Sequence, residues 1–444
     1  MFSSAEDFSA KGGQIKSIKA REILDSRGNP TVEVDLTTDF GIFQSSVPSG
    51  ISKGKYEAVE IRDGGKRCHG KGVRIAVKNV NEIIGPKLKG KDPTKQMEID
   101  NLMIKLDGTK NKSKLGGNSI LGLSMAVCRA GAKAKKLPLW KYISQITKTN
   151  PILPTPSVLV IEGGLHAGNE LDFQEFMIVP QVKRFSKALE MASEIYQELK
   201  NIIKEKYIDL AINVGDEGGF VPPVRVPEEA IELILRVAKN LGYQDKIAII
   251  LDIAASQFYV KGTYKMKIGA FTKQGLLNYY STLIKKYPIL GLEDPFGEED
   301  WEGWKALSSK TELPSMEAKV KKRTKFSSPF KVQSSKLLII GDDLLATNIK
   351  RMKMAKEKNA CNAVIIKPNQ IGTVTEAISA VKLAKHYGWK IMVSHRGGDT
   401  CDDFIADFAV GISADFIKAG APARGERVAK YNRLLRIEEK VCTN

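Results

Sequence analysis

From residue 155 onward, short apolar runs alternate with stretches of helical periodicity. The runs are rich in β-branched residues, as at Val364-Ile365-Ile366, which is typical of strands buried on both faces of a parallel sheet. They lie at 157–161, 176–179, 247–252, 289–293, 337–342, 364–367, 391–395 and 416–418. Helical spacing recurs between them at 188–204, 227–241, 273–286 and 374–387. The alternation predicts right-handed crossovers between parallel strands, and the number of runs favours a (β/α)8 barrel over an open sheet.

The first part of the chain has a different pattern. Residues 31–36 alternate apolar and polar side chains, as a strand with one wet face does, and a dense turn signal precedes them at 25–30. Helical spacing follows at 74–84 and 119–136. We therefore predict an α/β protein with a smaller N-terminal α+β domain at 15–150 and a C-terminal TIM-type barrel domain at 151–444. Residues 1–14 are small and polar, which predicts a disordered tail and no secretory signal.

One segment interrupts the barrel pattern. Glu293 and Asp342 are 49 positions apart, whereas Asp342 and Lys367 are 25 apart. The excess falls at 313–336, which is rich in lysine, serine and proline and lacks helical periodicity. We predict a basic surface insertion on the helix side of the barrel, outside any active site. A solvated loop is the favoured interpretation, and a segment that binds nucleic acid or an acidic surface is the alternative.

Composition narrows the class of protein. The chain has 444 residues, 42% of them hydrophobic, and a net charge of +18; no apolar run reaches the length of a membrane span. Five cysteines without a CxxC pair indicate reduced thiols and a cytoplasmic protein. With only four histidines, any metal site is expected to use carboxylates, which suit Mg²⁺. The basic charge is interpreted as a property of the whole surface and not as a sign of one anionic partner.

Ionisable residues end the later runs. Asp252, Glu293, Asp342, Lys367 and Lys418 each end a run, and His395 with Arg396 ends another. Active sites of such barrels lie at the carboxyl ends of the strands, so these side chains should converge. Carboxylates that meet without a cation would repel one another, which predicts a divalent metal; salt bridges to the lysines are the alternative.

The same residues indicate an acid–base reaction. Lys367 and Lys418 would lie beside the metal, and neighbouring cations should make a neutral, basic lysine more accessible. Such a base suits removal of a proton next to a carboxylate. Glu217, in the glycine-rich acidic loop 213–220, is the candidate general acid, although a plain acidic turn would have the same appearance.

Longer stretches of the chain closely resemble the enolase family. The resemblance spans about residues 18–440 and rests on AREILDSRGNPTVE at 20–33, GGLHAGN at 163–169, QEFM at 174–177, VGDEGGF at 214–220, LEDPF at 292–296, GDDL at 341–344, Lys367 with NQIGT at 369–373, SHR at 394–396, and KAGAPARGER at 418–427. It implies reversible dehydration of 2-phosphoglycerate to phosphoenolpyruvate in glycolysis and gluconeogenesis. The pairing of a lysine base with Mg²⁺ is itself known chemistry of the enolase superfamily.

The resemblance also implies individual roles. Lys367 would be the base and Glu217 the acid. Asp252, Glu293 and Asp342 would bind the first of two Mg²⁺ ions, and Ser52 would bind the second. The substrate contacts would be His166, Glu175, Glu293, Asp342, His395, Arg396 and Lys418. The small domain would supply loops that close over the site, and the protein would be a homodimer.

Several positions depart from the family pattern. Gly397 stands where a serine is usual, Ile51 and Lys53 flank Ser52 in place of smaller residues, and Glu162 and Leu165 replace an asparagine and a serine. We expect these changes to affect substrate affinity more than reaction type, since one neutral hydrogen bond contributes about 1 kcal/mol. The alternatives are a paralogue with reduced catalysis that acts mainly as a binding protein, and a related acid-sugar dehydratase.

Overall fold

The computed structural model describes residues 13–50, 54–207, 209–309 and 336–442. The predicted tail at 1–14 and the predicted insertion at 313–336 lie almost entirely outside the described residues, and so do Ile51, Ser52 and Lys53. Within the described residues, no helix is both long enough and apolar enough to cross a membrane.

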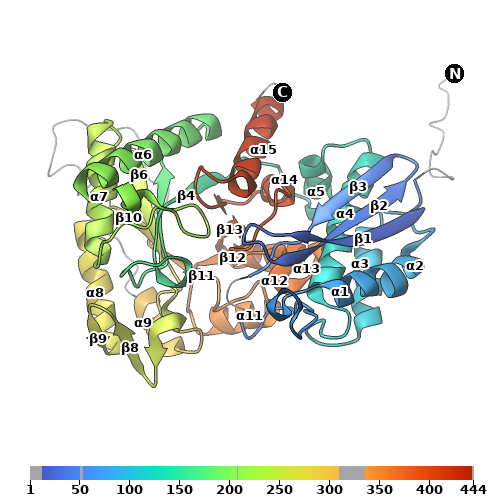
Figure 1. The fold of residues 1–444 in the computed structure, drawn as a ribbon, viewed down its shortest axis with the longest axis horizontal. Helices are drawn as coiled ribbons and strands as arrows, with labels where there is room; N and C mark the ends of the chain where they lie inside the picture. The colour runs from blue at the N-terminus through green and yellow to red at the C-terminus, as the bar shows by residue number, and fades with distance from the viewer. Residues whose placement is uncertain (1–12, 51–53, 208, 310–335, 443–444) are drawn as a thin grey trace.

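The N-terminal part is a three-stranded antiparallel sheet with helices against it (Figure 1). Its strands are β1 (Ser17–Leu24), β2 (Pro30–Thr38) and β3 (Gly41–Ser46). The helices are α1 (Arg74–Lys78), the π-helical turn η2 (Asn79–Ile84), α2 (Gly85–Leu88), α3 (Gln96–Asp107), α4 (Gly117–Ala134) and α5 (Leu139–Thr147). The strand predicted at 31–36 and the helices predicted at 74–84 and 119–136 are therefore confirmed.

The rest of the chain forms a closed barrel of eight strands. Its strands are β4 (Thr155–Glu162), β5 (Glu175–Pro180), β6 (Ile247–Asp252), β10 (Ile289–Glu293), β11 (Leu338–Gly341), β12 (Ala363–Ile366), β13 (Lys390–Ser394) and β14 (Phe416–Lys418). Every apolar run predicted as a strand from residue 155 onward overlaps one of them. Between β6 and β10 the chain adds a small sheet of β7 (Tyr259–Val260), β8 (Thr263–Met266) and β9 (Gly269–Phe271), which the sequence analysis missed.

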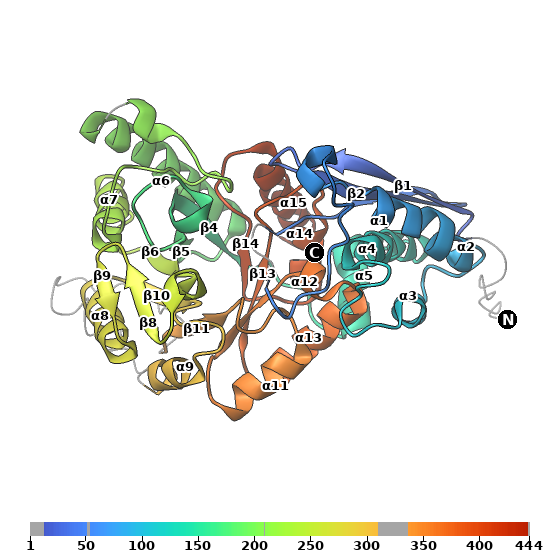
Figure 2. The same cartoon turned by 60° about the horizontal axis from the view of Figure 1, so that its bottom comes forward.

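Helices surround the barrel strands (Figure 2). They are α6 (Phe185–Lys206), α7 (Pro227–Asn240), α8 (Lys273–Lys286), α9 (Trp301–Ser308), α11 (Ile349–Glu357), α13 (Val374–His386), α14 (Phe404–Gly411) and α15 (Gly425–Cys442). A short helix, α12 (Pro368–Ile371), follows β12 at the barrel mouth. The amphipathic stretches at 188–204, 227–241, 273–286 and 374–387 correspond to α6, α7, α8 and α13.

One strand contradicts the prediction of a fully parallel sheet. β5 runs antiparallel to both of its neighbours, β4 and β6. The segment between β4 and β5 contains only a short 3-10 turn, Gly164–His166, and a parallel return needs a longer crossover, usually through a helix. As a result, the first residue of β5 lies at the barrel end where the other strands finish.

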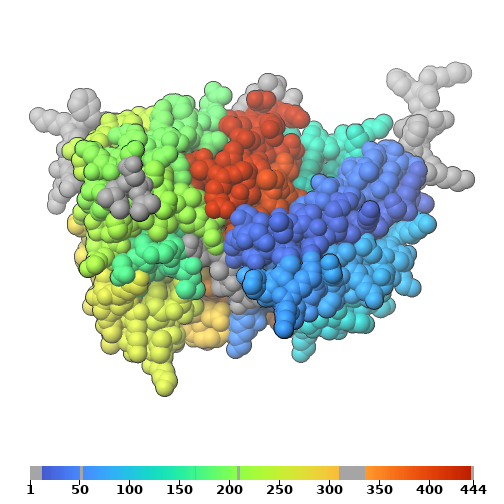
Figure 3. Space-filling view, in the orientation of Figure 1, coloured from blue at the N-terminus to red at the C-terminus, as the bar shows by residue number. Residues whose placement is uncertain are grey.

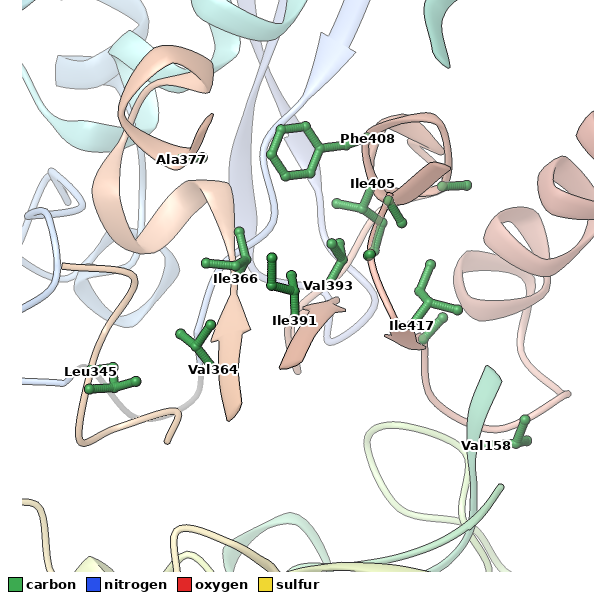
Figure 4. Close-up of a cluster of buried hydrophobic side chains, with 14 of the residues drawn as sticks. Val158, Leu345, Val364, Ile366, Ala377, Ile391, Val393, Ile405, Phe408 and Ile417 are labelled. Atoms are coloured by element: carbon green, nitrogen blue, oxygen red, sulfur yellow. The ribbon is translucent and has the colours of Figure 1, made fainter. Parts of the chain in front are cut away.

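The barrel strands are buried on both faces, as their apolar runs predict. On β12, Ile365 belongs to the cluster inside the barrel. Its neighbours Val364 and Ile366 belong to the larger core outside the barrel strands, where they lie near Ile391 and Val393 of β13 (Figure 4). Because successive side chains of a strand point to opposite faces, a continuous apolar run can fill both layers.

The N-terminal part packs against the C-terminal end of the chain (Figure 3). Arg129 of α4 donates two hydrogen bonds to Asp402, at 2.9 and 2.8 Å. Ser49 pairs with Gly398 as an isolated β-bridge. These contacts bring the segment after β3 to the mouth of the barrel.

Candidate active site

Four carboxylates lie side by side at the barrel mouth. Glu162, Glu175, Asp252 and Glu293 are register partners on the neighbouring strands β4, β5, β6 and β10. All four side chains are buried. The reversed direction of β5 is the reason that Glu175, at the start of its strand, joins residues that end theirs.

Lys418 is the cation at the centre of this group. Its Nζ lies 3.0 Å from Asp252 Oδ2, 2.9 Å from both carboxylate oxygens of Glu293 and 3.1 Å from Glu175 Oε1. Burial opposes the ammonium form, but the charges of Asp252, Glu175 and Glu293 raise the pKa of Lys418 well above its ordinary value. Lys418 therefore stays charged and is held by all three carboxylates.

One ammonium group, that of Lys418, does not balance the three carboxylates around it. Burial raises the pKa of the Glu293 carboxyl well above its ordinary value, and the charge of Asp252 adds to the effect. Burial likewise raises the pKa of Glu175, against the attraction of Lys418. Buried carboxyls with raised pKa values, facing one another, are the surroundings in which a cation binds favourably.

Asp342 and Lys367 form the next pair around the barrel. Asp342 follows β11, and its Oδ2 is ion-paired with Lys367 Nζ. Its Oδ1 accepts a hydrogen bond from Gln370 Nε2 at 2.9 Å. Gln370 in turn accepts from Thr347, whose hydroxyl oxygen also accepts from the backbone N–H of Lys367. The loop after β11 and the helix α12 thus hold Lys367 and Asp342 in one hydrogen-bond network.

The predicted lowering of the Lys367 pKa is wrong for this arrangement. Burial and the charges of Arg396 and Lys418 do favour the neutral amine, as expected. The charge of Asp342 outweighs them, and the pKa of Lys367 lies above its ordinary value. Both lysines are therefore held by salt bridges to carboxylates, as the alternative interpretation predicted. Lys367 becomes neutral more readily only when another positive charge pairs with Asp342.

Asp294 and Asp343 also lie in this group and were not predicted from the sequence. Carboxylate oxygens of Asp294, Asp342 and Asp343 lie within 4.8 Å of one another. Burial raises the pKa of Asp294 well above its ordinary value and that of Asp343 to about 7. Asp294 accepts hydrogen bonds from the backbone N–H groups of Asp342 and Asp343, at 3.0 and 2.8 Å. Asp294 lies in the motif LEDPF next to Glu293, and Asp343 lies in the motif GDDL next to Asp342; only Glu293 and Asp342 were predicted as site residues.

The donor atoms fit a divalent cation. Asp252, Glu293 and Asp342 present only carboxylate oxygens, which suit Mg²⁺ and similar hard cations. The raised pKa of Glu293 indicates a group that a nearby dication would stabilise in its charged form.

Glu217 lies across the mouth, in the loop that follows the 3-10 turn Asp209–Ile212. Its backbone N–H donates to the Glu162 carboxylate at 3.1 Å, and the N–H of Gly219 donates to the same group at 3.0 Å. A Cβ at Gly215 would meet Glu162 Cδ at 2.5 Å, so the loop closes over this carboxyl only with glycine at 215. Burial, and then the charge of Glu217, raise the pKa of Glu162 to about 9.

His395 and Arg396 follow β13 on the same side as Glu217. His395 Nε2 lies 3.1 Å from Glu217 Oε2. Burial is the main cause that lowers the pKa of His395, to about 4. Arg396 pairs with Glu57 of the N-terminal part, with 2.8 Å between Nη1 and Oε2. Glu57 was not predicted, since nothing in its local sequence distinguishes it from a surface glutamate.

Other predicted positions are placed only in part. Ser52 lies outside the described residues, and for His166 only the backbone is described, in the turn between β4 and β5. Among the departures from the family pattern, Leu165 is exposed and Glu162 is buried. The carbonyl oxygen of Gly397 accepts a hydrogen bond from Arg427 at 2.6 Å. Glu57, Glu175, Glu217, Asp252, Asp342, Lys367, His395, Arg396 and Lys418 line one cavity.

Comparison with known proteins gives matches over both parts of the chain. The family described as "Enolase, N-terminal domain" matches residues 15–143. The family described as "Enolase, C-terminal TIM barrel domain" matches residues 150–319 and 319–444. "Enolase 1" of Entamoeba histolytica is 49% identical over 442 residues, which cover 96% of each chain. "Enolase" of Mastigamoeba balamuthi is 49% identical over 445 residues, which cover 97% of this chain and 96% of the relative.

Proposed function

The chain belongs to the enolase family and is a lyase of the phosphopyruvate hydratase type that acts in glycolysis, and on this premise we propose which residue carries out each step of the reaction. The substrate is 2-phosphoglycerate and the product phosphoenolpyruvate. The observation that supports this assignment is that Lys367 and Glu217 line the same cavity.

Lys367 is the base. Its unprotonated Nζ takes the proton from C2, and the electron pair left behind moves into the substrate carboxylate. The side chain is nearly buried, which keeps water away from the amine. A positioned general base of this kind contributes about 10²–10⁴-fold to the rate.

Glu217 is the acid. It gives a proton to the C3 hydroxyl, the C3–O bond breaks and water leaves. The electron pair then returns from the carboxylate to form the C2–C3 double bond. The two transfers thus remove one proton and one hydroxide, which is the water that the reaction releases.

Asp252, Glu293 and Asp342 would hold a Mg²⁺ ion, and Ser52 a second one. When bound, such cations supply positive charge for the substrate carboxylate as its negative charge increases, and they weaken the hold of Asp342 on the Lys367 proton. Lys418 stays charged between Glu175, Asp252 and Glu293 and adds a fixed cation to the substrate side.

Arg396 binds the phosphate through its forked guanidinium. In the described structure the Glu57 carboxylate pairs with the Arg396 guanidinium. The substrate phosphate then replaces the Glu57 carboxylate as the anion beside Arg396. His166, Glu175 and His395 complete the substrate contacts. Gly397 supplies backbone groups where the family has a serine.

Two substitutions test the division of roles. We expect Lys367→Ala to abolish both phosphoenolpyruvate formation and exchange of the C2 proton with solvent. We expect Glu217→Gln to slow loss of water by about 10²-fold or more while some exchange at C2 continues. Both quantities are measured on 2-phosphoglycerate, by absorbance of the product and by NMR in D₂O.

The results separate the roles from one another. Exchange at C2 that survives in Lys367→Ala would rule out this residue as the base. Loss of both C2 exchange and turnover in Glu217→Gln would show that Glu217 has another role. Absence of turnover in the unaltered protein would favour the paralogue that acts mainly as a binding protein.

We also propose that the protein is a cytoplasmic homodimer. The support is the membership of the family and the free thiols of Cys68, Cys128, Cys361 and Cys401. Light scattering coupled to gel filtration measures the mass directly, with 48.9 kDa expected for one chain.

A further inference from the structure

Arg427 is a fully buried arginine beside the acid side of the active site. It lies on α15, and its side chain has no exposed surface. Its Nη2 donates to the carbonyl oxygens of Gly397 at 2.6 Å and Asp216 at 3.1 Å. Its Nη1 donates to the carbonyl oxygen of Arg396 and lies 2.6 Å from Nδ1 of His395. Arg427 therefore joins the loop of Glu217 to the loop of His395.

The contact between Arg427 and His395 determines which ring nitrogen carries the proton. A guanidinium has only donors and keeps its charge in proteins. At 2.6 Å from it, Nδ1 of His395 must accept the hydrogen bond and cannot carry a proton. The proton of the neutral ring is then on Nε2.

Nε2 is the nitrogen that faces the candidate acid. It lies 3.1 Å from Oε2 of Glu217. A protonated Nε2 can only donate to this oxygen, and a donor facing Oε2 disfavours a proton on the same oxygen. The acidic proton of Glu217 is then on Oε1.

We propose that Arg427 is a positioning residue of the acid step: by donating to Nδ1 of His395 it holds the ring neutral with its proton on Nε2, and so confines the transferable proton of Glu217 to Oε1. The inference rests on the proposed role of Glu217 as the acid. It adds a residue that touches neither the substrate nor the metal ligands.

The charges around the ring agree with a neutral His395. Glu217 and Asp399 favour the imidazolium, while burial and Arg427 disfavour it. Asp399 lies 3.4 Å from Arg427 Nη1 and 3.0 Å from Lys430 Nζ, and Glu426 lies 3.3 Å from Arg427 Nε. Lys418 contributes its backbone oxygen, which accepts from His395 N–H at 3.0 Å. Burial and Arg427 outweigh the two carboxylates, and the pKa of His395 falls to about 4.

The arrangement helps the acid in the step that it performs. When Glu217 gives up the proton on Oε1, negative charge appears on both of its oxygens. Nε2 lies 3.1 Å from Oε2 without hydrogen-bond geometry between these two atoms. The charge that develops on Oε2 favours formation of that hydrogen bond, because a hydrogen bond to an ionised acceptor is stronger than one to a neutral acceptor. No proton passes through His395, because its Nδ1 remains engaged by Arg427.

The tautomer of His395 can be measured without any turnover. The chain has four histidines, so ¹⁵N-histidine labelling gives few ring signals, and His395→Gln identifies those of His395 by their absence. We expect Nε2 to carry the proton, and the ring to remain neutral from pH 8 down to about pH 5. A proton on Nδ1, or a ring charged at pH 6, would overturn the proposal.

Arg427→Met tests whether Arg427 is the cause. We expect the His395 signals to change to a mixture of tautomers that titrates at higher pH, and kcat to fall at least tenfold with a smaller change in KM. Lys430→Met is the matched control, because Lys430 is another buried cation on α15 that contacts Thr400, Glu426 and Asp399 and not His395. It should leave the tautomer unchanged.

The possible outcomes are distinguishable. An unchanged tautomer in folded Arg427→Met, or the same change in Lys430→Met, would contradict the proposal. If Arg427→Met does not fold, Arg427→Lys, which keeps one donor and the charge, should retain part of the Nε2 tautomer. If the unaltered protein has the predicted tautomer but no turnover, the proposed function fails while the placement of the proton stands.

Discussion

The two sides of the barrel mouth hold their ionisable groups by different means. On the charge-paired side, formed by Glu175, Asp252, Glu293 and Lys418, carboxylates from neighbouring strands share one buried ammonium. On the hydrogen-bonded side, formed by Glu162, Glu217, His395 and Arg427, backbone N–H groups hold a carboxyl and an arginine holds a neutral ring.

The difference follows from the elements that supply the residues. Strand ends in register bring like charges together, and these require cations. The loop of Glu217 and the segment after β13 bring backbone donors and acceptors, which can hold a group in one protonation state. Abstraction of a proton assisted by cations suits the first side, and delivery of a single proton suits the second.

Removing the shared cation should have the largest effect. Lys418→Met leaves Glu175, Asp252 and Glu293 buried without their partner, which costs about 3–5 kcal/mol. The Glu175 and Glu293 carboxyls then keep protons in the folded state that the unfolded state releases, so the stability of the variant should fall as pH rises above about 4. Urea unfolding at pH 5 and pH 8 measures both effects.

An exposed lysine in an ion pair provides the control. Lys390 lies 2.7 Å from Asp415, and about half of its side chain is exposed. Lys390→Met should cost less than about 1 kcal/mol and show little dependence on pH. Equal losses in the two variants would mean that burial does not distinguish the charge-paired side.

Divalent cations should stabilise the charge-paired side next most strongly. At about 100 times its Kd, Mg²⁺ adds about 2.7 kcal/mol to the free energy of unfolding if it binds only the folded protein. Thermal unfolding with and without Mg²⁺ measures the increase, and a chelator should reverse it and abolish turnover. Glu293→Gln should reduce the increase; an unaffected increase in this variant would place the ion elsewhere.

The smallest effect is expected on the hydrogen-bonded side, from Glu162→Gln. The folded carboxyl has a pKa of about 9 against an ordinary value of 4.5, so between these pH values the folded state keeps a proton that the unfolded state has lost. The unaltered protein therefore loses stability as pH rises through this window. The glutamine variant lacks this loss, because its amide oxygen can accept from Glu217 and Gly219 at any pH.

Unfolding at pH 5.5 and pH 8.5 tests this prediction. The difference in stability between the variant and the unaltered protein should shift in favour of the variant from the lower to the higher pH. Glu170→Gln removes an exposed carboxylate from the same segment and should show no such shift. A variant that loses stability with pH as the unaltered protein does would show that Glu162 is already ionised.

Much of the fold could be predicted because its signals are local. The apolar runs identified the barrel strands, since a strand buried on both faces needs apolar side chains at every position. Helical spacing located α6, α7, α8 and α13. The small sheet β7–β9 was missed because its strands are too short to show a periodicity.

The candidate residues at strand ends could also be predicted, since parallel strands in a barrel finish at one end. Glu175 reached the list only through the resemblance to the enolase family. Its position depends on the reversal of β5, which follows from the absence of a crossover helix after β4. Asp294 and Asp343 were overlooked because adjacent acidic residues do not reveal which of them points into the site.

The sequence alone determined the architecture, the family and the chemical types of the groups at the barrel mouth, because these depend on periodicity and on motifs of neighbouring residues. Only the tertiary structure decided their states. The charge on Lys367 depends on Asp342, 25 positions away, and the tautomer of His395 depends on Arg427, a residue of another element. Burial and the nearest charges set protonation, and both are properties of the folded chain.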